Sequence, residues 1–443
     1  MTVQKLLKQK IKTANEVASL VKSGDRVDYG FGLTQPDLFD EALATQKDRL
    51  SDVSVCGTIT ISPRQVIECD PEQKHFTFQG WHLSGYDRKK ADEGLVSYIP
   101  FNFGEGPEIY RKYLEVDMVV LKTTTMDEGG YFNFGVSSTF ARACCDVAKK
   151  IVVETSTEMP VCRGSQACVH ISEVEAVIEG NNLPMFEFPR ASITEVDRKV
   201  AEFIVPMIES GSCIQIGIGG MPNAVCSALA SSDVEDLGIH TEMFVDAMLD
   251  LVDAGKITGR FKQTYPGEIT YTFAMGSKKM YDFLDNNQGC LTLPVNETNL
   301  PQFIAQNDKV VSINNCMQID LTGQVSSESQ GYRQITGTGG QLQFVRGAVA
   351  SKGGKSFMCL SSQYKDKEGN FHSRIVPGIN PGSVVTTPRT DVMYVVTEYG
   401  VVNLKGKNTS ERALALISIA HPDDHEMLMQ QARENQIVSR KYW

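Results

Sequence analysis

The chain has 443 residues, 41% of them hydrophobic and 22% charged, which is the composition of a globular protein rather than a disordered one. This length exceeds one ordinary core and predicts two domains of roughly 200 residues each. The net charge of −11 argues against a nucleic-acid partner and against an anionic membrane surface. No apolar run approaches the length of a membrane span, and lysines interrupt the start too often for a secretory signal. We therefore expect a cytoplasmic protein.

The cysteines and histidines indicate neither disulfides nor a metal site. Eleven cysteines are an odd number without any Cys-x-x-Cys spacing, so buried free thiols are expected, including the adjacent Cys144 and Cys145. His421 and His425 have the spacing of helical metal ligands. Pro422 and the aspartates after it are more typical of a solvated helix start. No metal is expected.

Helical periodicity alternates with short β-branched runs along the whole chain, which predicts mostly parallel sheets built from crossover units. The expected strands are 27–31, 53–56, 118–122, 150–154, 213–218, 310–313, 357–360 and 392–397. The expected helices are 14–22, 36–45, 107–114, 138–148, 195–209, 222–231, 243–255, 277–285, 410–419 and 423–435.

An internal repeat is indicated by two landmarks. Residues 23–36 and 210–222 both open with Ser-Gly, continue through an apolar alternation and end in Gly-x-Gly followed by proline. A valine-rich run follows each opening serine at a similar distance, 96 residues on at Val119 and 100 residues on at Val310. Two landmarks at one spacing favour a duplicated α/β unit, although Gly-x-Gly turns recur in α/β proteins generally. The boundary is expected near 189–193, giving domains 1–190 and 191–443.

Three glycine-rich turns are candidates for ligand binding. The turn at 217–223 nearly fits a dinucleotide fingerprint, but Pro222 occupies the place of the third glycine and suits the first turn of a helix. The turn at 337–341 also lacks the third glycine and has a plain loop turn as its alternative. The stretch 352–356 resembles a phosphate loop, but Val349 replaces the leading glycine, which favours a solvated turn between strands.

Glu242 follows the first of these turns within the stretch His240-Thr241-Glu242-Met243. A glutamate can attack an activated acyl group and become acylated itself. Backbone N–H groups in a glycine turn can hold the oxyanion that forms, or the pyrophosphate of a nucleotide. This pairing predicts an enzyme, whereas an arbitrary glutamate would be a solvated side chain.

Together these motifs resemble the acetyl-CoA hydrolase/transferase family, the class I CoA-transferases, in its butyryl-CoA:acetate and 4-hydroxybutyrate branch. The resemblance spans nearly the whole chain. It rests on residues 217–225, 240–243 and 337–341, with support from 312–315, 394–400 and 416–423.

The resemblance implies two tandem, similar, open α/β domains with the active site between them. It makes Glu242 the covalent nucleophile, and we expect oxyanion donors at the N–H groups of Gly339 and Gly340. Coenzyme A enters as a substrate, with no permanently bound cofactor, and a homo-oligomer is expected. The implied coenzyme-binding residues are Gly217, Ile218, Gly219, Gly220, Met221, Met317 and Gly340.

The chain departs from the family pattern at two places. Gln343 precedes Phe344 where the family usually has an aspartate two residues after Gly-Gly-Gln. The stretch Glu154–Glu158 precedes Met159-Pro160 where the family usually has asparagines. Both departures leave the nucleophile in place and bear on acyl specificity.

The predicted function is a CoA-transferase that moves coenzyme A from butyryl- or propionyl-CoA to acetate through a glutamyl-CoA thioester with ping-pong kinetics. Its partners would be an acyl-CoA and a small carboxylic acid, without nucleic acid or membrane. An acyl-CoA hydrolase and a 4-hydroxybutyrate CoA-transferase are the alternatives on the same scaffold. A dinucleotide oxidoreductase and a non-catalytic CoA-binding sensor are the rivals from other classes.

Overall fold

The computed structural model describes residues 2–443. Their contacts form two compact units that interleave along the chain. The first unit runs to Pro189 and also takes in Glu242–Phe244 and Thr270–Thr298; the second comprises Arg190–Thr241, Val245–Ile269 and Asn299–Trp443. The division into domains 1–190 and 191–443 stays a prediction.

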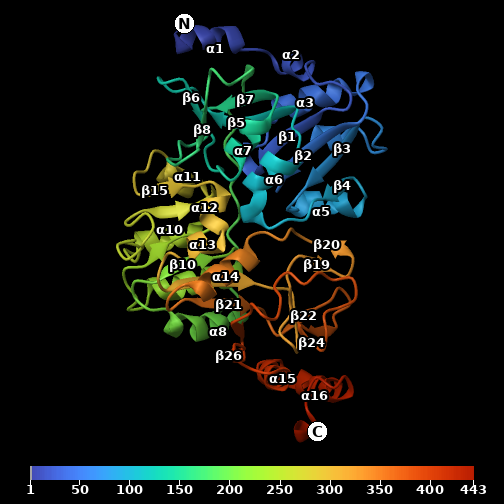
Figure 1. The fold of residues 1–443 in the computed structure, drawn as a ribbon, viewed down its shortest axis with the longest axis vertical. Coiled ribbons are helices and arrows are strands. Elements are labelled where there is room, and N and C mark those ends of the chain that lie inside the picture. Colours follow the sequence, from blue (N-terminus) through green and yellow to red (C-terminus); the bar gives the residue numbers. More distant parts are fainter. Residues whose placement is uncertain (1) are drawn as a thin grey trace. The chain divides into compact units, whose positions relative to one another are not determined.

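The first unit is built on a seven-stranded parallel sheet with the strand order β4-β3-β2-β1-β5-β7-β9 (Figure 1). Alternate residues of its strands enter two hydrophobic clusters, one with α2 and α3 and the other with α6 and α7, so the helices cover both faces. The strands are β1 (Arg26–Phe31), β2 (Val53–Thr58), β3 (Phe76–Gly80), β4 (Val96–Tyr98), β5 (Met118–Thr124), β7 (Lys150–Ser156) and β9 (Ala176–Glu179). The helices are α2 (Ala14–Ala18), α3 (Leu38–Thr45), α6 (Gly106–Tyr113) and α7 (Ala141–Val147).

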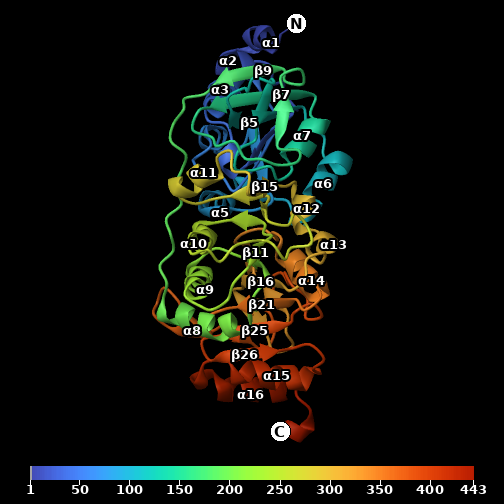
Figure 2. The same cartoon turned by 90° about the vertical axis from the view of Figure 1, so that its left-hand side faces the viewer.

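The second unit has a six-stranded sheet with the order β11-β10-β16-β21-β25-β26, parallel except for the last pair. Figure 2 shows α8, α9 and α10 on one side of its central strands and α13 and α14 on the other. The strands are β10 (Cys213–Ile216), β11 (Gly238–Ile239), β16 (Val310–Asn315), β21 (Lys355–Cys359), β25 (Tyr394–Thr397) and β26 (Gly400–Asn403). The helices are α8 (Glu195–Ile204), α9 (Gly220–Ala230), α10 (Asp246–Asp253), α13 (Pro301–Ile304) and α14 (Gln341–Ala350).

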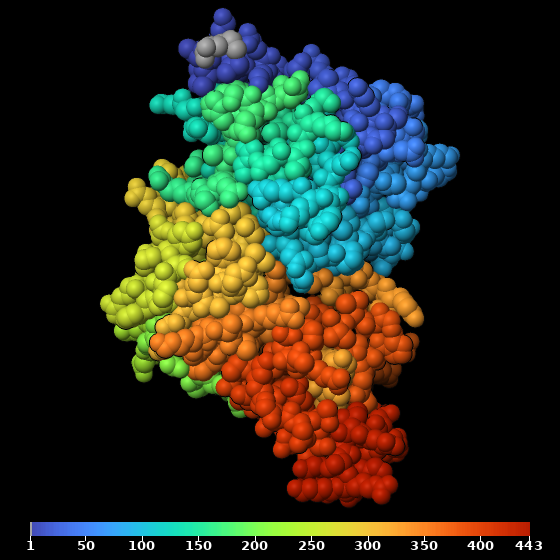
Figure 3. All heavy atoms as spheres, viewed as in Figure 1, coloured from blue at the N-terminus to red at the C-terminus, as the bar shows by residue number. Residues whose placement is uncertain are grey.

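Two helices, α15 (Thr409–Ser418) and α16 (His425–Glu434), lie near the C-terminus. They bury Leu416 and Leu428 in a cluster with Val395 of β25 and form the red surface at the C-terminal end of the chain in Figure 3. Within residues 2–443, no helix combines the length and the apolar composition that crossing a membrane requires.

The two sheets share one topology, which confirms the predicted pair of similar α/β units. The run β2-β1-β5-β7-β9 in the first corresponds to β11-β10-β16-β21-β25 in the second, with every neighbour parallel. In each sheet the central strand pairs in parallel with the outer strand that follows it in the chain, as in the Cα pairs Val27–Val55 and Ile214–Ile239. The segments that open with Ser-Gly lead into β1 and β10, the central strands.

The predicted strands are all present, but several predicted boundaries are wrong. The helices expected at 14–22 and 195–209 end at Ala18 and Ile204. The helix expected at 243–255 begins only at Asp246, because Met243 and Phe244 form β12 (Met243–Phe244) and pair with β14 (Phe273–Ala274). Strand β10 ends at Ile216, before the glycine turn. The stretch 352–356 was expected to be a turn between two strands. It lies instead between helix α14 and β21, and its last two residues belong to β21.

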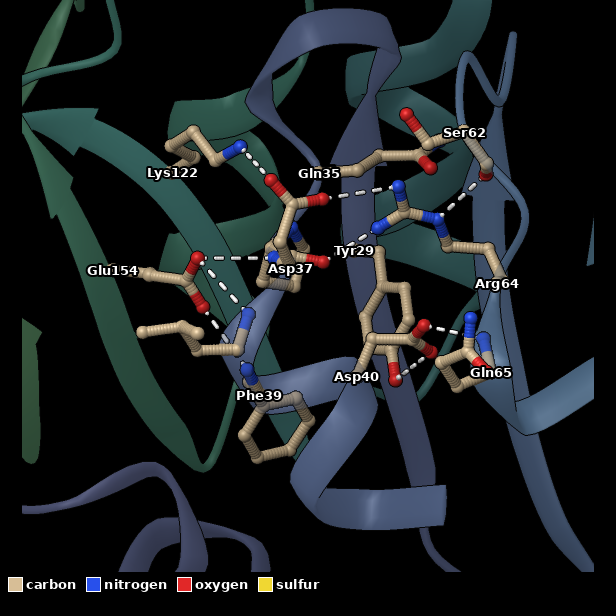
Figure 4. A network of polar contacts seen from close by, with 12 residues as sticks. Tyr29, Gln35, Asp37, Phe39, Asp40, Ser62, Arg64, Gln65, Lys122 and Glu154 are labelled. Atoms are coloured by element: carbon tan, nitrogen blue, oxygen red, sulfur yellow. Dashed lines mark hydrogen bonds and ion pairs between the residues drawn. The ribbon is translucent and has the colours of Figure 1, made fainter. Parts of the chain in front are cut away.

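A buried polar network fixes α3 at the carboxyl edge of the first sheet (Figure 4). The Glu154 carboxylate, on β7, accepts hydrogen bonds from the N–H groups of Asp37 (3.0 Å), Leu38 (3.2 Å) and Phe39 (3.0 Å). It thereby satisfies the first N–H groups of the helix, which lack partners inside the helix. Burial raises the pKa of Glu154, and the three N–H donors oppose that rise.

The Asp37 side chain does not cap α3, because it is bound by Arg64 (3.1 Å) and by Lys122. Burial alone would raise its pKa, but the two cations lower it below its usual range. Asp40 lies deeper and accepts hydrogen bonds from the Tyr29 hydroxyl and the Gln65 N–H group. Burial raises the pKa of Asp40 to about 6. Helix α3 is therefore held by charges from distant parts of the chain.

Glu154→Ala should lower the free energy of unfolding of the first unit by about 3 kcal/mol, because it leaves buried N–H groups without an acceptor. Urea denaturation followed by circular dichroism measures the change. Glu158→Ala, which removes an exposed glutamate four residues later, is the control and should change stability by less than about 0.5 kcal/mol. Equal effects of the two substitutions would contradict the capping role.

Candidate active site

The glycine turn of the second unit connects β10 to α9. The Gly217 N–H group donates to the Ile313 carbonyl (3.2 Å), which continues the pairing of β10 with β16 for one more residue. Gly219 has a φ of +122°, a conformation that side chains disfavour, and α9 starts at the next residue without a side-chain cap. Ile218 at the tip is 61% exposed. The first turn of α9 thus has the features of an anion-binding helix start.

The turn lies where the strand order of the sheet reverses. From β10 the chain moves outward to β11 and then returns to add β16, β21 and β25 on the other side. In open α/β sheets, ligands bind at the carboxyl ends of the two strands flanking such a reversal, here β10 and β16. Asn315, the last residue of β16, donates from Nδ2 to the Ile218 carbonyl at 3.3 Å. The loops after the two strands are therefore in contact.

A third loop reaches the same edge. Residues 337–340 lead into α14, with Gly339 at a φ of +58° and Gly340 as the N-cap residue. The next residue, Gln341, donates from Nε2 to the Asn315 carbonyl at 3.5 Å and contacts the Met358 sulfur at 3.0 Å. Met317, two residues beyond β16, is held through its backbone by Ser326 and Arg374. The loop after β10, the loop after β16 and the start of α14 thus meet.

Polar side chains support these loops from within the sheet. The Gln215 Oε1 atom accepts from the Ser312 hydroxyl (2.9 Å) and the Asn314 amide (3.3 Å), and Asn314 also donates to Ser312 (2.7 Å). Gln215 and Ser312 are buried and are Cα partners on β10 and β16. This network sets the spacing of the two strands one step before their loops. The sequence motif Ser312–Asn315 supported the resemblance, but nothing in the sequence pointed to Gln215.

Glu242 belongs to the first unit, although β11 of the second unit ends only three residues before it. Its backbone carbonyl accepts from the N–H groups of Thr272 (3.1 Å) and Phe273 (3.2 Å), and its side chain is half-buried. Phe244 is fully buried and stacks on Phe283, while Met243 packs against the core of the first unit. These two apolar residues therefore have core roles in the first unit.

A buried lysine joins two backbone segments of the second unit, one of which leads to Glu242. Lys262 donates from Nζ to the carbonyls of Ile239 (3.0 Å) and Glu268 (2.6 Å). Burial lowers its pKa to about 8. The two carbonyls precede the two places where the chain passes into the first unit, at Glu242 and at Thr270. Sequence reasoning missed Lys262, because no motif marks a lysine bonded to backbone carbonyls.

Every predicted site residue except Glu242 lies in the second unit, where Gly217–Met221, Met317, Gly339 and Gly340 come to one edge of the sheet. Their chemical roles stay predictions. Over residues 2–443, no group of three or more His, Cys, Asp or Glu side chains could hold a metal ion. Cys144 and Cys145 are buried free thiols, as predicted, and burial raises the pKa of Cys145 to about 12.

Comparisons with known proteins identify relatives along the whole chain. Residues 1–187 match the acetyl-CoA hydrolase/transferase N-terminal domain, and residues 276–432 match the C-terminal domain of the same family. A butyryl-CoA:acetate CoA-transferase of Anaerostipes caccae is 45% identical over 99% of both chains. A probable butyrate:acetyl-CoA coenzyme A-transferase of Syntrophomonas wolfei is 47% identical over 98% of both. The crystal structure of RipA from Yersinia pestis superposes with a TM-score of 0.91 at 35% identity, covering 99% of this chain and 100% of RipA.

Gly220→Ala should destabilise the start of α9. A methyl group there would lie 2.6 Å from the Ser192 carbonyl oxygen, which is backbone and cannot move away cheaply. We expect a loss of about 1–3 kcal/mol in the free energy of unfolding of the second unit, measured by urea denaturation. Gly85→Ala is the matched control, since a methyl group there meets no atom within 4 Å. Unchanged stability of Gly220→Ala would show that this contact is not tight.

Proposed function

This chain belongs to the acetyl-CoA hydrolase/transferase family, and we propose that it transfers coenzyme A between a short-chain acyl-CoA and acetate. The proposed donor is butyryl-CoA or propionyl-CoA. The observation that carries the proposal is the 45–47% identity, over nearly the whole chain, to a butyryl-CoA:acetate CoA-transferase and a probable butyrate:acetyl-CoA coenzyme A-transferase. Family membership likewise favours coenzyme A over a dinucleotide at the Gly217 turn.

Glu242 is the proposed nucleophile. Its carboxylate would attack the thioester carbonyl, breaking the C–S bond, releasing the CoA thiolate and forming a mixed anhydride. The thiolate would then attack the glutamyl carbonyl, which releases the free acid and leaves a glutamyl-CoA thioester. Acetate reverses these steps and leaves as acetyl-CoA. No atom is oxidised or reduced, so the reaction needs no further reactant. The backbone hydrogen bonds of Glu242 to Thr272 and Phe273 support this role by fixing its main chain.

The loops of the second unit are the proposed coenzyme site. Gly217–Met221 and Met317 would contact coenzyme A, whose phosphates suit the N-terminus of α9, which has no side-chain cap. The N–H groups of Gly339 and Gly340 are the proposed oxyanion donors, each worth roughly 3 kcal/mol to the transition state. The support is geometric, because these loops meet at the strand-order reversal through the contacts of Asn315 and Gln341.

Hydrolysis and 4-hydroxybutyrate activation stay the alternatives, since both would use the same glutamate. In hydrolysis water accepts the acyl group, and in the second alternative 4-hydroxybutyrate accepts the coenzyme. The cytoplasmic location and the homo-oligomeric state expected from the sequence also stay predictions.

Glu242→Gln should abolish turnover by at least about 1,000-fold, because a carboxamide cannot serve as this nucleophile. Binding of coenzyme A, measured by calorimetry, should stay within about threefold. Peptide mass spectrometry of the unmodified protein after incubation with acyl-CoA should find CoA on Glu242. Glu179→Gln, an exposed glutamate of the first unit, is the control and should be fully active. Modification of a cysteine instead would overturn the assignment.

Transfer should exceed hydrolysis. With butyryl-CoA alone, release of free thiol should be slow, because no acid is present to complete the exchange. Adding acetate should produce acetyl-CoA and butyrate with parallel double-reciprocal plots, the pattern of ping-pong kinetics. Chromatography of the CoA esters measures both products. Rapid thiol release that acetate leaves unchanged would make the protein a hydrolase, and a strong preference for succinate over acetate would remove the proposed acceptor.

A further inference from the structure

Glu328 is a buried carboxylate close to the proposed oxyanion donors, and no step of the reaction above uses it. Its residue is 3% exposed. It stands between β18 (Val325–Ser326) and β19 (Ser329–Gln330), and the hairpin of β19 with β20 (Arg333–Gln334) separates it in sequence from the turn at Gly339. The surrounding sequence Ser-Glu-Ser carried no signal for function.

The contacts of Glu328 run along the segment that leads into the turn. Its backbone carbonyl accepts from the N–H groups of Ile335 (2.8 Å) and Thr336 (3.2 Å). Its carboxylate accepts from the Thr338 hydroxyl at 3.0 Å and is 3.5 Å from the Gln334 amide nitrogen. Glu328 therefore binds residues on both sides of residue 337. The last of them, Thr338, directly precedes Gly339.

The chemistry of a carboxylate gives these contacts a direction. An ionised carboxylate can only accept hydrogen bonds, so in its contact with Glu328 the Thr338 hydroxyl is the donor. Hydrogen bonds to a charged group are stronger than neutral ones and compensate for taking the charge out of water. Gly339, at a φ of +58°, and Gly340 have no side chains, so the path of their backbone depends on neighbours such as Thr338.

We propose that Glu328 is a positioning residue, which acts through Thr338 to orient the N–H groups of Gly339 and Gly340. The inference rests on the proposed function in one respect, that these N–H groups stabilise the oxyanion. A misplacement of about 1 Å at a reacting centre can lower the rate about 100-fold. Loss of the Glu328–Thr338 hydrogen bond should therefore lower kcat while the KM for acyl-CoA changes little.

The decisive variant is Thr338→Val, which keeps the shape of the side chain and removes the donor. We expect kcat to fall about 10- to 100-fold, with the KM for butyryl-CoA within about threefold. Thr338→Ser, which retains a hydroxyl, should recover most of the loss. Glu368→Gln, the loss of an exposed carboxylate, is the charge control and should leave kcat unchanged. An unchanged kcat in Thr338→Val, or a raised KM at constant kcat, would overturn the proposal.

A double variant tests whether the two side chains act through one bond. Once Thr338→Val has removed the hydrogen bond, adding Glu328→Gln should lower kcat by less than it does alone, because coupled residues are not additive. Fully multiplicative losses would contradict the proposal. Glu328→Gln is safer than Glu328→Ala for folding, since it fills the same volume.

Amide hydrogen exchange separates this inference from the proposed function. Peptides covering 335–345 should exchange faster in Thr338→Val than in the unmodified protein, and as slowly as the unmodified protein in Thr338→Ser. If the unmodified protein fails to exchange CoA, the proposed function fails while this measurement still decides whether Glu328 orders the turn. Identical exchange in all variants would overturn the positioning role.

Discussion

Parallel strand pairing is the constraint on which the rest of the molecule depends. Parallel strands require a crossover, so the loops that follow them all emerge at one edge of the sheet. In the second unit this rule places the Gly217 turn beside Asn315, because β10 and β16 are neighbours in register. Helix α14, which precedes β21, then begins at the same edge, directly after Gly340. Residues 97 positions apart, Ile218 and Asn315, are thereby brought together.

The duplication shows how each unit stabilises that edge. Asp28 on β1 and Gln215 on β10 occupy matching positions. Asp28 directly follows Val27, which pairs with Val55, and Gln215 directly follows Ile214, which pairs with Ile239. Asp28 accepts from the N–H group of Gly30 (2.8 Å) and from the Tyr110 hydroxyl (2.6 Å). Gln215 instead binds Ser312 and Asn314 of the adjacent strand. Each central strand thus carries a buried, hydrogen-bonded polar side chain, with different partners in the two units.

Much of the fold was predictable from the sequence, because buried β-branched runs such as Val53–Cys56 and Val310–Ile313 have few alternatives to strands. The pairing of Met243 and Phe244 with β14 was not predictable, because a two-residue strand derives from a partner 30 residues away and has no periodicity of its own. The glycine turns and Glu242 were found through motifs. Gln215, Lys262 and Glu328 were missed, because a polar residue that supports a loop from behind leaves no local pattern.

The two departures from the family pattern acquire a physical meaning in the fold. Glu154 is fully buried, and both of its carboxylate oxygens bind N–H groups at the start of α3. Gln343 is also buried, within the first turn of α14. Any effect of these two buried side chains on acyl specificity has to act through the positions of α3 and α14, whereas Thr157 and Glu158 of the same stretch are exposed. Helix α14 starts at Gln341, directly after the glycine turn, so Gln343 can act on the reaction through the position of that turn.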